Sequence, residues 1–288
     1  MNLPLRLGSR GPDVARVQSI LGETADGIFG EITLAGVRTW QRARGLQPDG
    51  VVGPATWERM QGASTPSSSQ TNGGVVPNFS AALIAKGFPR CVDPAAWATA
   101  FTAAVGRFPA FNRTGWACIL AKANTEAGGL TRWDENLFYT TVEQVTRMHG
   151  SRAGLHPEKF LRNPRALGDQ VYAKWGGYDG RGLGVIQLTG LPNHTAFASD
   201  MGMSLGEARG YMQTIPGAAM TAPWYLQHYK AVDAANRGDM RAVLAVVAGK
   251  TVAGMDGIWA SIHGDQQMAD FERFKALLVG VRGKLICV

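Results

Sequence analysis

The sequence is short of cysteine, of long apolar runs and of clustered basic residues, and each shortage excludes a class of protein. Three cysteines in 288 residues, Cys91, Cys118 and Cys287, are too few for a disulfide framework or a cysteine-ligated metal site. No apolar run reaches the length of a membrane span. The five histidines show no metal-ligand spacing with carboxylates, so we expect neither a metal ion nor another cofactor. Cys118 falls in an apolar run and is expected in the core, and a Cys91–Cys287 bond has no support in the sequence.

Basic residues exceed acidic ones but form no long block. The net charge of +7 and the pI of about 9.5 favour an anionic partner: nucleic acid, an acidic cell-wall polymer or an anionic membrane surface. Because the basic residues are scattered, nucleic-acid binding is not the favoured interpretation, and no stable membrane insertion is expected. The first six residues lack the long apolar core of a signal peptide.

Length and composition predict two domains joined by a spacer. A chain of 288 residues with 45% hydrophobic content can bury a sizeable core. Residues 62–74 are almost all small or polar, which is typical of a flexible linker. We therefore expect a small domain over 1–62, a linker over 63–78 and a larger domain over 79–288.

An internal repeat organises the first domain. Asp26–Thr33 and Asp49–Thr56 share the pattern Asp-Gly-x-x-Gly-x-x-Thr. Each copy predicts a tight turn that runs into a helix, with Thr33 or Thr56 as the N-cap. Apolar residues at helical spacing flank the first copy, so we expect three short helices in a small bundle.

The second domain is predicted to be mostly helical, with two short extended stretches. Helices are expected over residues 95–105, 116–126, 142–149, 165–174, 216–229, 239–248 and 266–279. A short strand is expected at 136–140, and residues 185–190 predict a strand or extended wall. Alternation along that wall would place Gln187 and Thr189 on one face.

Two glutamates stand out as candidate catalytic groups. The apolar stripe of the run Trp116–Ala123, continued by three residues, reaches Glu126, and Gly128-Gly129 then supplies a helix stop. Such a carboxylate would point inward, where desolvation and the helix dipole favour the protonated form that a glycosidase general acid needs. Glu135 follows in a polar loop, and two carboxylates in different environments are the arrangement for glycoside hydrolysis. The alternative is that Glu126 is an ordinary solvated helix-end glutamate.

The first domain resembles a family of peptidoglycan-binding domains with a repeated Asp-Gly-x-x-Gly-x-x-Thr pattern. The stretches Leu7–Val14 and Trp40–Leu46 also fit this family, and the match covers roughly residues 3–61. The resemblance implies that this domain binds the stem peptide or the glycan of the bacterial wall.

The second domain resembles the family 19 glycoside hydrolases over roughly residues 95–260. The shared motifs are Glu126-x-Gly-Gly, Glu135-Asn136, Asn163-Pro164 with Val171-Tyr172, and Ile186-Gln187-Leu188-Thr189-Gly190 with Asn193. The resemblance implies that Glu126 is the general acid, Glu135 the general base, and Thr189 a holder of the attacking water. Gln187 and Asn193 stand where the family binds substrate, and Tyr139, Trp175 and Arg181 are further candidates for substrate binding.

Together the two domains resemble a modular phage endolysin. The implied fold is mainly α: a small three-helix peptidoglycan-binding domain linked to a lysozyme-like, mostly helical catalytic domain with a short β region. The expected activity is hydrolysis of β-1,4 bonds in peptidoglycan, with inversion. We expect a monomer that is made in the host cytoplasm without a signal peptide and, after release through a separate pore, acts on the cell wall in the periplasm. A chitinase, a lytic transglycosylase and a non-catalytic wall-binding or virion protein are the alternatives.

Overall fold

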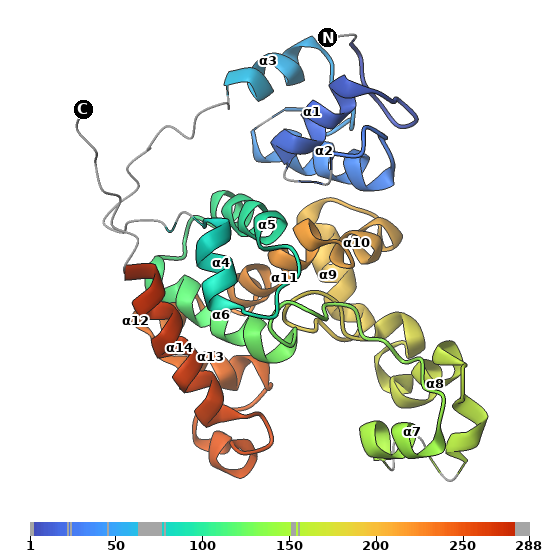
Figure 1. Cartoon of the computed structure of the whole chain (residues 1–288), viewed down its shortest axis with the longest axis vertical. Coiled ribbons are helices and arrows are strands. Elements are labelled where there is room, and N and C mark those ends of the chain that lie inside the picture. The colour runs from blue at the N-terminus through green and yellow to red at the C-terminus, as the bar shows by residue number, and fades with distance from the viewer. Residues whose placement is uncertain are drawn as a thin grey trace.

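The computed structural model describes residues 3–21, 23, 25–44, 46–62, 77, 79–150, 154 and 156–279. Over these residues the chain is mainly helical, and its β structure consists of isolated bridges. Figure 1 shows a three-helix unit above a larger helical body. Almost all of the expected linker, and Cys287, lie outside the described residues. None of the helices in the described part of the chain has the length and apolar character of a membrane span.

The N-terminal unit is a bundle of α1 (Pro12–Leu21), α2 (Glu31–Ala43) and α3 (Pro54–Gly62). Its own core contains fully buried side chains from each helix and from the turns between them: Val14, Val17, Phe29, Val37, Val52 and Met60. Isolated antiparallel bridges, Leu5 with Val52 and Arg10 with Ile28, tie the loops together. The predicted three-helix bundle is therefore confirmed.

The two copies of the repeat are held by two glutamines at equivalent positions. Gln18 Nε2 donates to Asp26 Oδ1, to the Ile28 carbonyl oxygen and to Thr33 Oγ1, at 2.8, 2.9 and 3.1 Å. Gln41 makes the same set in the second copy, at 2.7, 2.9 and 3.1 Å. In each copy the glutamine Oε1 also accepts the N–H of the turn glycine at 2.9 Å.

The predicted N-caps are wrong. Helix α2 begins at Glu31 and α3 at Pro54, so Thr33 and Thr56 lie inside the first turn of each helix. Both threonines are buried, and their hydroxyls accept hydrogen bonds from the two glutamines. The repeat threonine therefore ties the turn to the preceding helix.

Helix α6 (Arg113–Glu126) is the central element of the larger body. It packs against α14 (Gly264–Val279), α12 (Val232–Arg237) and α11 (Ile215–His228). Residues 115–123 are all buried, so the helix is enclosed on every side, where a single stripe was predicted. Cys118 is fully buried, as predicted.

The other predicted helices are present with small shifts at their ends. They are α5 (Pro94–Arg107), capped by Asp93, α7 (Val142–His149), α8 (Pro164–Val171), α11, α13 (Met240–Val247) and α14. The predicted helix over 165–174 ends at Val171 and is followed by the short 3-10 turn η3 (Ala173–Trp175). The remaining elements are α4 (Ala81–Gly87), α9 (Leu191–Met201), α10 (Leu205–Met212), η2 (Pro157–Phe160), η4 (Gly177–Gly180) and η5 (Ala253–Ile258).

Residues 137–150 and 156–180 form a small lobe that projects from the main body in Figure 1, where α7 and α8 lie apart from α6. The lobe has a core of its own, made by Leu137, Val145, Leu167, Val171 and Tyr172. The strand predicted at 136–140 is absent. The Phe138 N–H donates to Asn136 Oδ1 at 2.8 Å. This hydrogen bond forms a local turn in place of the backbone hydrogen bonds to a neighbouring strand.

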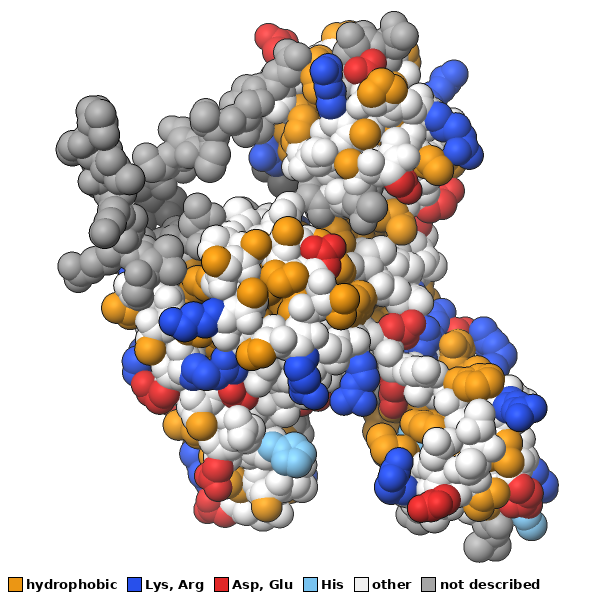
Figure 2. All heavy atoms as spheres, in the orientation of Figure 1, with side chains coloured by type: hydrophobic (Ala, Val, Ile, Leu, Met, Phe, Trp, Pro, Cys, Tyr) orange, Lys and Arg blue, Asp and Glu red, His pale blue; other side chains and the backbone are white. Residues whose placement is uncertain are grey.

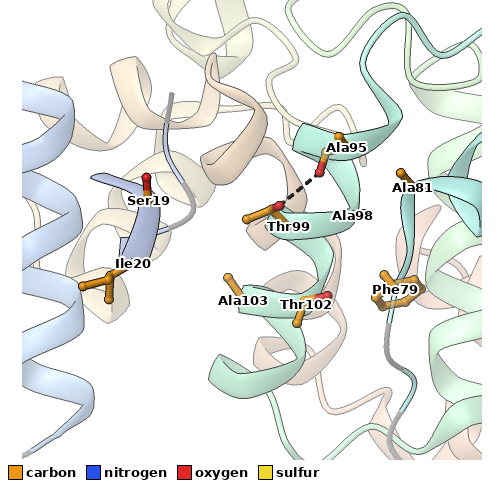
Figure 3. Close-up of a pocket in the computed structure, with 9 residues that line it drawn as sticks. All are labelled: Ser19, Ile20, Phe79, Ala81, Ala95, Ala98, Thr99, Thr102 and Ala103. Carbon is orange, nitrogen blue, oxygen red and sulfur yellow. Dashed lines mark hydrogen bonds between the residues drawn. The ribbon is translucent and has the colours of Figure 1, made fainter. Parts of the chain in front are cut away.

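The N-terminal bundle contacts the larger body through α2 and α10. Arg38 Nη1 lies 3.1 Å from Glu207 Oε1, and the Thr39 hydroxyl donates to the Met201 carbonyl oxygen at 3.5 Å. A cavity of about 530 Å³ lies between α1 and α5, lined by Ser19, Ile20, Thr99 and Ala103 among others (Figure 3). These residues are small or apolar, and the candidate catalytic glutamates are not among them.

Candidate active site

Glu126 is the last residue of α6, and its carboxylate is held by a lysine one turn earlier. Lys122 Nζ donates to Glu126 Oε1 at 2.6 Å. The lysine side chain is only 6% exposed, whereas the glutamate side chain is 32% exposed. Glu126 is therefore neither fully enclosed, as the extended stripe predicted, nor an unpartnered surface group.

The helix stop after Glu126 is confirmed. Gly128, Gly129 and Leu130 all have left-handed backbone angles, with φ of 58°, 76° and 63°. Glycine adopts this conformation without steric cost, so the pair of glycines reverses the chain immediately after the helix. The reversed chain then runs toward Glu135.

Glu135 is held by two hydrogen-bond donors from a distant part of the sequence. The Tyr172 hydroxyl lies 2.6 Å from both Oε1 and Oε2 of Glu135. The Gly182 N–H donates to Oε2 at 3.1 Å, and the Glu135 N–H donates back to the Gly182 carbonyl oxygen at 3.2 Å. The second carboxylate thus has a phenol and a backbone amide as partners, while the first has an ammonium.

Asp134, the neighbour of Glu135, binds a different group. Arg181 approaches Asp134 Oδ1 with Nη2 at 3.0 Å and Nε at 3.2 Å. The Arg181 guanidinium also lies 4.3 Å from the centre of the Tyr178 ring, and the residue is only 5% exposed. In this structure Arg181, expected to bind substrate, is buried and paired inside the protein.

Gln187 and Thr189 do not alternate along an extended wall. Bridges join Asp134 to Leu183 and Leu183 to Leu188, so residues 184–187 form a tight turn. Gln187 has a left-handed φ of 52°, and its side-chain amide donates to the Gly184 carbonyl oxygen at 3.2 Å. The predicted alternation is therefore wrong.

The same turn nevertheless brings Gln187 close to Glu135. A Cβ atom on Gly182 would lie 2.8 Å from Gln187 Oε1, so glycine lets the amide approach the segment that binds Glu135. The Thr189 hydroxyl donates to the Gln187 carbonyl oxygen at 2.9 Å. Asn193 continues the chain of contacts, with Nδ2 2.8 Å from the Thr189 carbonyl oxygen and Oδ1 2.5 Å from the Tyr229 hydroxyl.

Trp175 and Tyr139 flank these groups. The Trp175 ring is 45% exposed and lies 6.1 Å from the Tyr172 ring, and its Cδ1 is near Gly190, next to Thr189. The Tyr139 hydroxyl lies 3.2 Å from His149 Nε2. Burial raises the pKa of Tyr139, and the negative charge of Glu135 raises it further. Tyr139 therefore lies near the candidate base, and Trp175 lies beside Tyr172, which donates to that base.

Sequence reasoning missed Lys122, Gly182 and the role of Tyr172. Lys122 could have been found, because residues four apart lie on one face of a helix. Tyr172 lies in the Val171-Tyr172 motif, but 37 residues separate it from Glu135, so no local pattern connects the two. Glu126 and Glu135 are thus two carboxylates with different hydrogen-bond partners. Such a pair can supply one proton donor and one proton acceptor for the hydrolysis of a glycosidic bond.

The space-filling view places this region in context. Figure 2 shows the molecule hollowed between the projection that carries α7 and α8 and the one that carries α13 and α14. The segment with Asp134 and Glu135 leads from α6 into the first of these projections. Charged side chains of both signs are scattered over this face, and the scatter of the basic residues was predicted from the sequence.

Comparisons with known proteins agree with both halves of the sequence analysis. Residues 10–60 match the family described as "Putative peptidoglycan binding domain". A protein of Haemophilus influenzae named "Glycosyl hydrolase family 19 domain-containing protein" is 30% identical over 142 residues, which cover 46% of this chain and 70% of that protein.

Two further similarities are weaker. An "Uncharacterized protein in bpoA1 3'region" of Kitasatospora aureofaciens is 50% identical over 40 residues, so the match spans 14% of this chain and about a third (34%) of that protein. The crystal structure of the Burkholderia AP3 phage endolysin aligns with 96% of this chain and 99% of its own, at 16% identity and a TM-score of 0.36. On the Haemophilus relative, the chain belongs to glycosyl hydrolase family 19, and its residues 10–60 match the peptidoglycan-binding family.

Proposed function

We propose that the protein is an endolysin-type glycoside hydrolase that cuts β-1,4 bonds of the peptidoglycan glycan with inversion. The observation that carries the proposal is the pair of carboxylates, one at the end of α6 beside Lys122 and one held by Tyr172 and Gly182. Membership of family 19 and the wall-binding domain support peptidoglycan as the polymer.

In the proposed mechanism Glu126 is the general acid. Its carboxyl group gives a proton to the glycosidic oxygen as the bond to the anomeric carbon breaks. The carboxylate that remains is 2.6 Å from the Lys122 ammonium. This positive charge stabilises the negative charge that develops on Glu126 as the proton leaves.

Glu135 is the general base in this mechanism. It accepts a proton from a water molecule that attacks the anomeric carbon from the face opposite the leaving group. The Thr189 hydroxyl helps to hold that water, and Gln187 and Asn193 bind the sugars nearby. Trp175, with its large exposed ring, offers a surface on which a sugar can stack.

The variant Glu126→Gln tests the acid. Glutamine keeps the shape of the side chain and an oxygen that can accept from Lys122, but it has no proton to give. Lysis of outer-membrane-stripped bacteria, followed as turbidity, should slow by about a hundredfold or more. Circular dichroism should show a folded protein. Parent-like lysis by this folded variant would remove Glu126 from the mechanism.

A role for the N-terminal domain in binding the wall is the second part of the proposal. Binding to an insoluble polymer raises the local concentration of the attached enzyme. A fluorescent fusion of residues 1–62 should pellet with purified peptidoglycan. The chain from Val75 onward should keep its rate on soluble fragments and lose rate on whole walls. Equal rates on whole walls with and without the domain would contradict this role.

A further inference from the structure

The hydrogen bonds to Glu135 are unequal between its two oxygens. The Tyr172 hydroxyl is 2.6 Å from both, whereas the Gly182 N–H reaches only Oε2, at 3.1 Å. An ionised carboxylate has about four lone-pair sites, two on each oxygen. Among the described residues, Oε2 thus accepts from two donors, while Oε1 shares only the phenol hydrogen and keeps a lone pair for another proton.

The donor to both oxygens comes from a separate part of the fold. Tyr172 follows α8 and belongs to the core of the lobe, with Leu167 and Val171. It is only 8% exposed, so its hydrogen bond to Glu135 is shielded from bulk water. Glu135 itself is anchored to Gly182, next to the Leu183 bridge of the main body. The Tyr172 hydroxyl therefore links the core of the lobe to the Glu135 carboxylate.

We propose that Tyr172 is a positioning residue for the general base, which it orients so that Oε1 takes the proton of the attacking water. This inference rests on the proposed role of Glu135. The phenol O–H and the Gly182 N–H fix the rotation of the carboxylate about its last bond. That rotation decides which lone pair faces the substrate. If the rotation is fixed before substrate binds, the carboxylate does not have to reorient during the reaction, and the activation free energy is lower.

A purely structural role for Tyr172 predicts a different outcome. A tyrosine that only joins the lobe to the body would, when changed, lower the melting temperature and reduce activity equally at every pH. A positioning role predicts a fall in kcat with little change in KM. It also predicts that the acid limb of the pH–rate profile moves to higher pH, because the ionised base loses a donor that favours its charged form.

The experiment compares Tyr172→Phe with Tyr178→Phe. Tyr178 lies in the same lobe, and its ring contacts the guanidinium groups of Arg165 and Arg181 through its face, which phenylalanine preserves. For Tyr172→Phe we expect kcat to fall by about tenfold, the equivalent of one lost hydrogen bond to a charged group, and the acid limb to rise. Tyr178→Phe should keep the parent profile.

Site-specific replacement of Tyr172 by 3-fluorotyrosine strengthens the hydrogen bond to Glu135, whereas Tyr172→Phe removes it. A fluorinated phenol is a stronger donor and nearly the same size, so the acid limb should move to lower pH while the fold is kept. A parent-like profile in both Tyr172 variants would overturn the proposal. So would a loss in Tyr172→Phe that is uniform over pH and matched by a fall in melting temperature.

A carbon-13 titration of the Glu135 carboxyl group by NMR separates this inference from the proposed function. It needs no substrate, and assignment comes from comparison with Glu135→Gln. A titration midpoint that rises in Tyr172→Phe supports the positioning role even if the enzyme acts on another polymer. An unchanged midpoint, with Glu135→Gln inactive on peptidoglycan, would overturn the role of Tyr172 and leave the proposed function standing.

Discussion

Lys122 and Glu126 lie one turn apart on α6 and form an ion pair in which Nζ is 2.6 Å from Oε1. The lysine side chain is almost fully buried, and nearly every residue around it on α6 belongs to the core. A buried ammonium needs a charged or polar partner, and Glu126 supplies it. The pair therefore couples the stability of the central helix to the candidate acid.

Replacing Lys122 with methionine should lower the rate of hydrolysis more than the stability of the fold. Methionine has a similar length and removes the buried charge, so we expect the protein to fold. The negative charge that develops on Glu126 as its proton leaves then lacks the ammonium that lies 2.6 Å away in the parent, so kcat on purified peptidoglycan should fall by about tenfold to a hundredfold. Lys86→Met, on the exposed face of α4, is the control, and equal kcat values for the two variants would contradict the role given to Lys122.

Glu135, Thr189 and Asp134 should differ sharply in their importance for the rate. Glu135→Gln removes the base and should cost at least about a hundredfold in rate. Thr189→Ala should cost less, because it removes only a hydroxyl oxygen that can accept a hydrogen bond from the water, the hydroxyl hydrogen being donated to the Gln187 carbonyl oxygen. Asp134→Asn should cost little, since Asp134 binds Arg181. Rates on purified peptidoglycan decide the order, and an Asp134 variant slower than the Glu135 variant would reverse the assignment.

The repeat glutamines should be the most sensitive polar residues of the N-terminal bundle. Gln18→Ala and Gln41→Ala each remove the partner of several buried or part-buried groups, Thr33 or Thr56 among them. At about 1 kcal/mol per hydrogen bond, each change should destabilise the bundle by roughly 2–4 kcal/mol. Thermal unfolding of the full chain and pelleting with peptidoglycan measure the effect. Gln47→Ala, at an exposed site, is the control, and a loss as large there would refute the special role.

Glu23 should make the contact between the two domains weaken as pH rises. Burial raises the pKa of its carboxyl group from 4.5 to about 7, and the residue lines a cavity with Tyr211 and Arg107 of the larger body. The folded state therefore favours the protonated form. Its contribution is present below pH 4.5 and is lost as pH rises through 7.

Glu23→Gln should raise the melting temperature at pH 8 and leave it nearly unchanged at pH 4. The gain should be about 1–3 kcal/mol, because the amide does not have to ionise. Glu31→Gln, at an exposed site on α2, should show no such pH dependence. A melting temperature that rises equally at both pH values would contradict the explanation by ionisation.

The sequence predicted the helices well because their signals are local. Capping residues such as Asp93, a first-turn proline and apolar periodicity all act within a few residues of each helix end. The helix stop at Gly128-Gly129 is of the same kind, since glycine alone takes left-handed angles without cost. These features need no knowledge of the rest of the fold.

The details of the site depend on contacts between distant segments, and there the sequence predictions failed. The alternation that placed Gln187 and Thr189 on one face assumes an extended chain, but Gln187 has a φ of 52° in a tight turn. Tyr172 lies 37 residues after Glu135 in the sequence, and only the packing of the lobe brings its hydroxyl to the carboxylate. Thr33 and Thr56 are not caps because α2 and α3 begin two residues earlier, and their hydroxyls accept from Gln18 and Gln41, which are distant in the sequence.

The origin of the oxygen at the new sugar end tests the central claim most directly. Purified peptidoglycan is digested in water enriched in oxygen-18, and the soluble fragments are read by mass spectrometry. A hydrolase in which Glu135 activates water should give reducing ends that carry one oxygen-18 atom, and Glu135→Gln should give almost none. Anhydro ends without oxygen-18, formed equally well by Glu135→Gln, would contradict the account and identify a lytic transglycosylase.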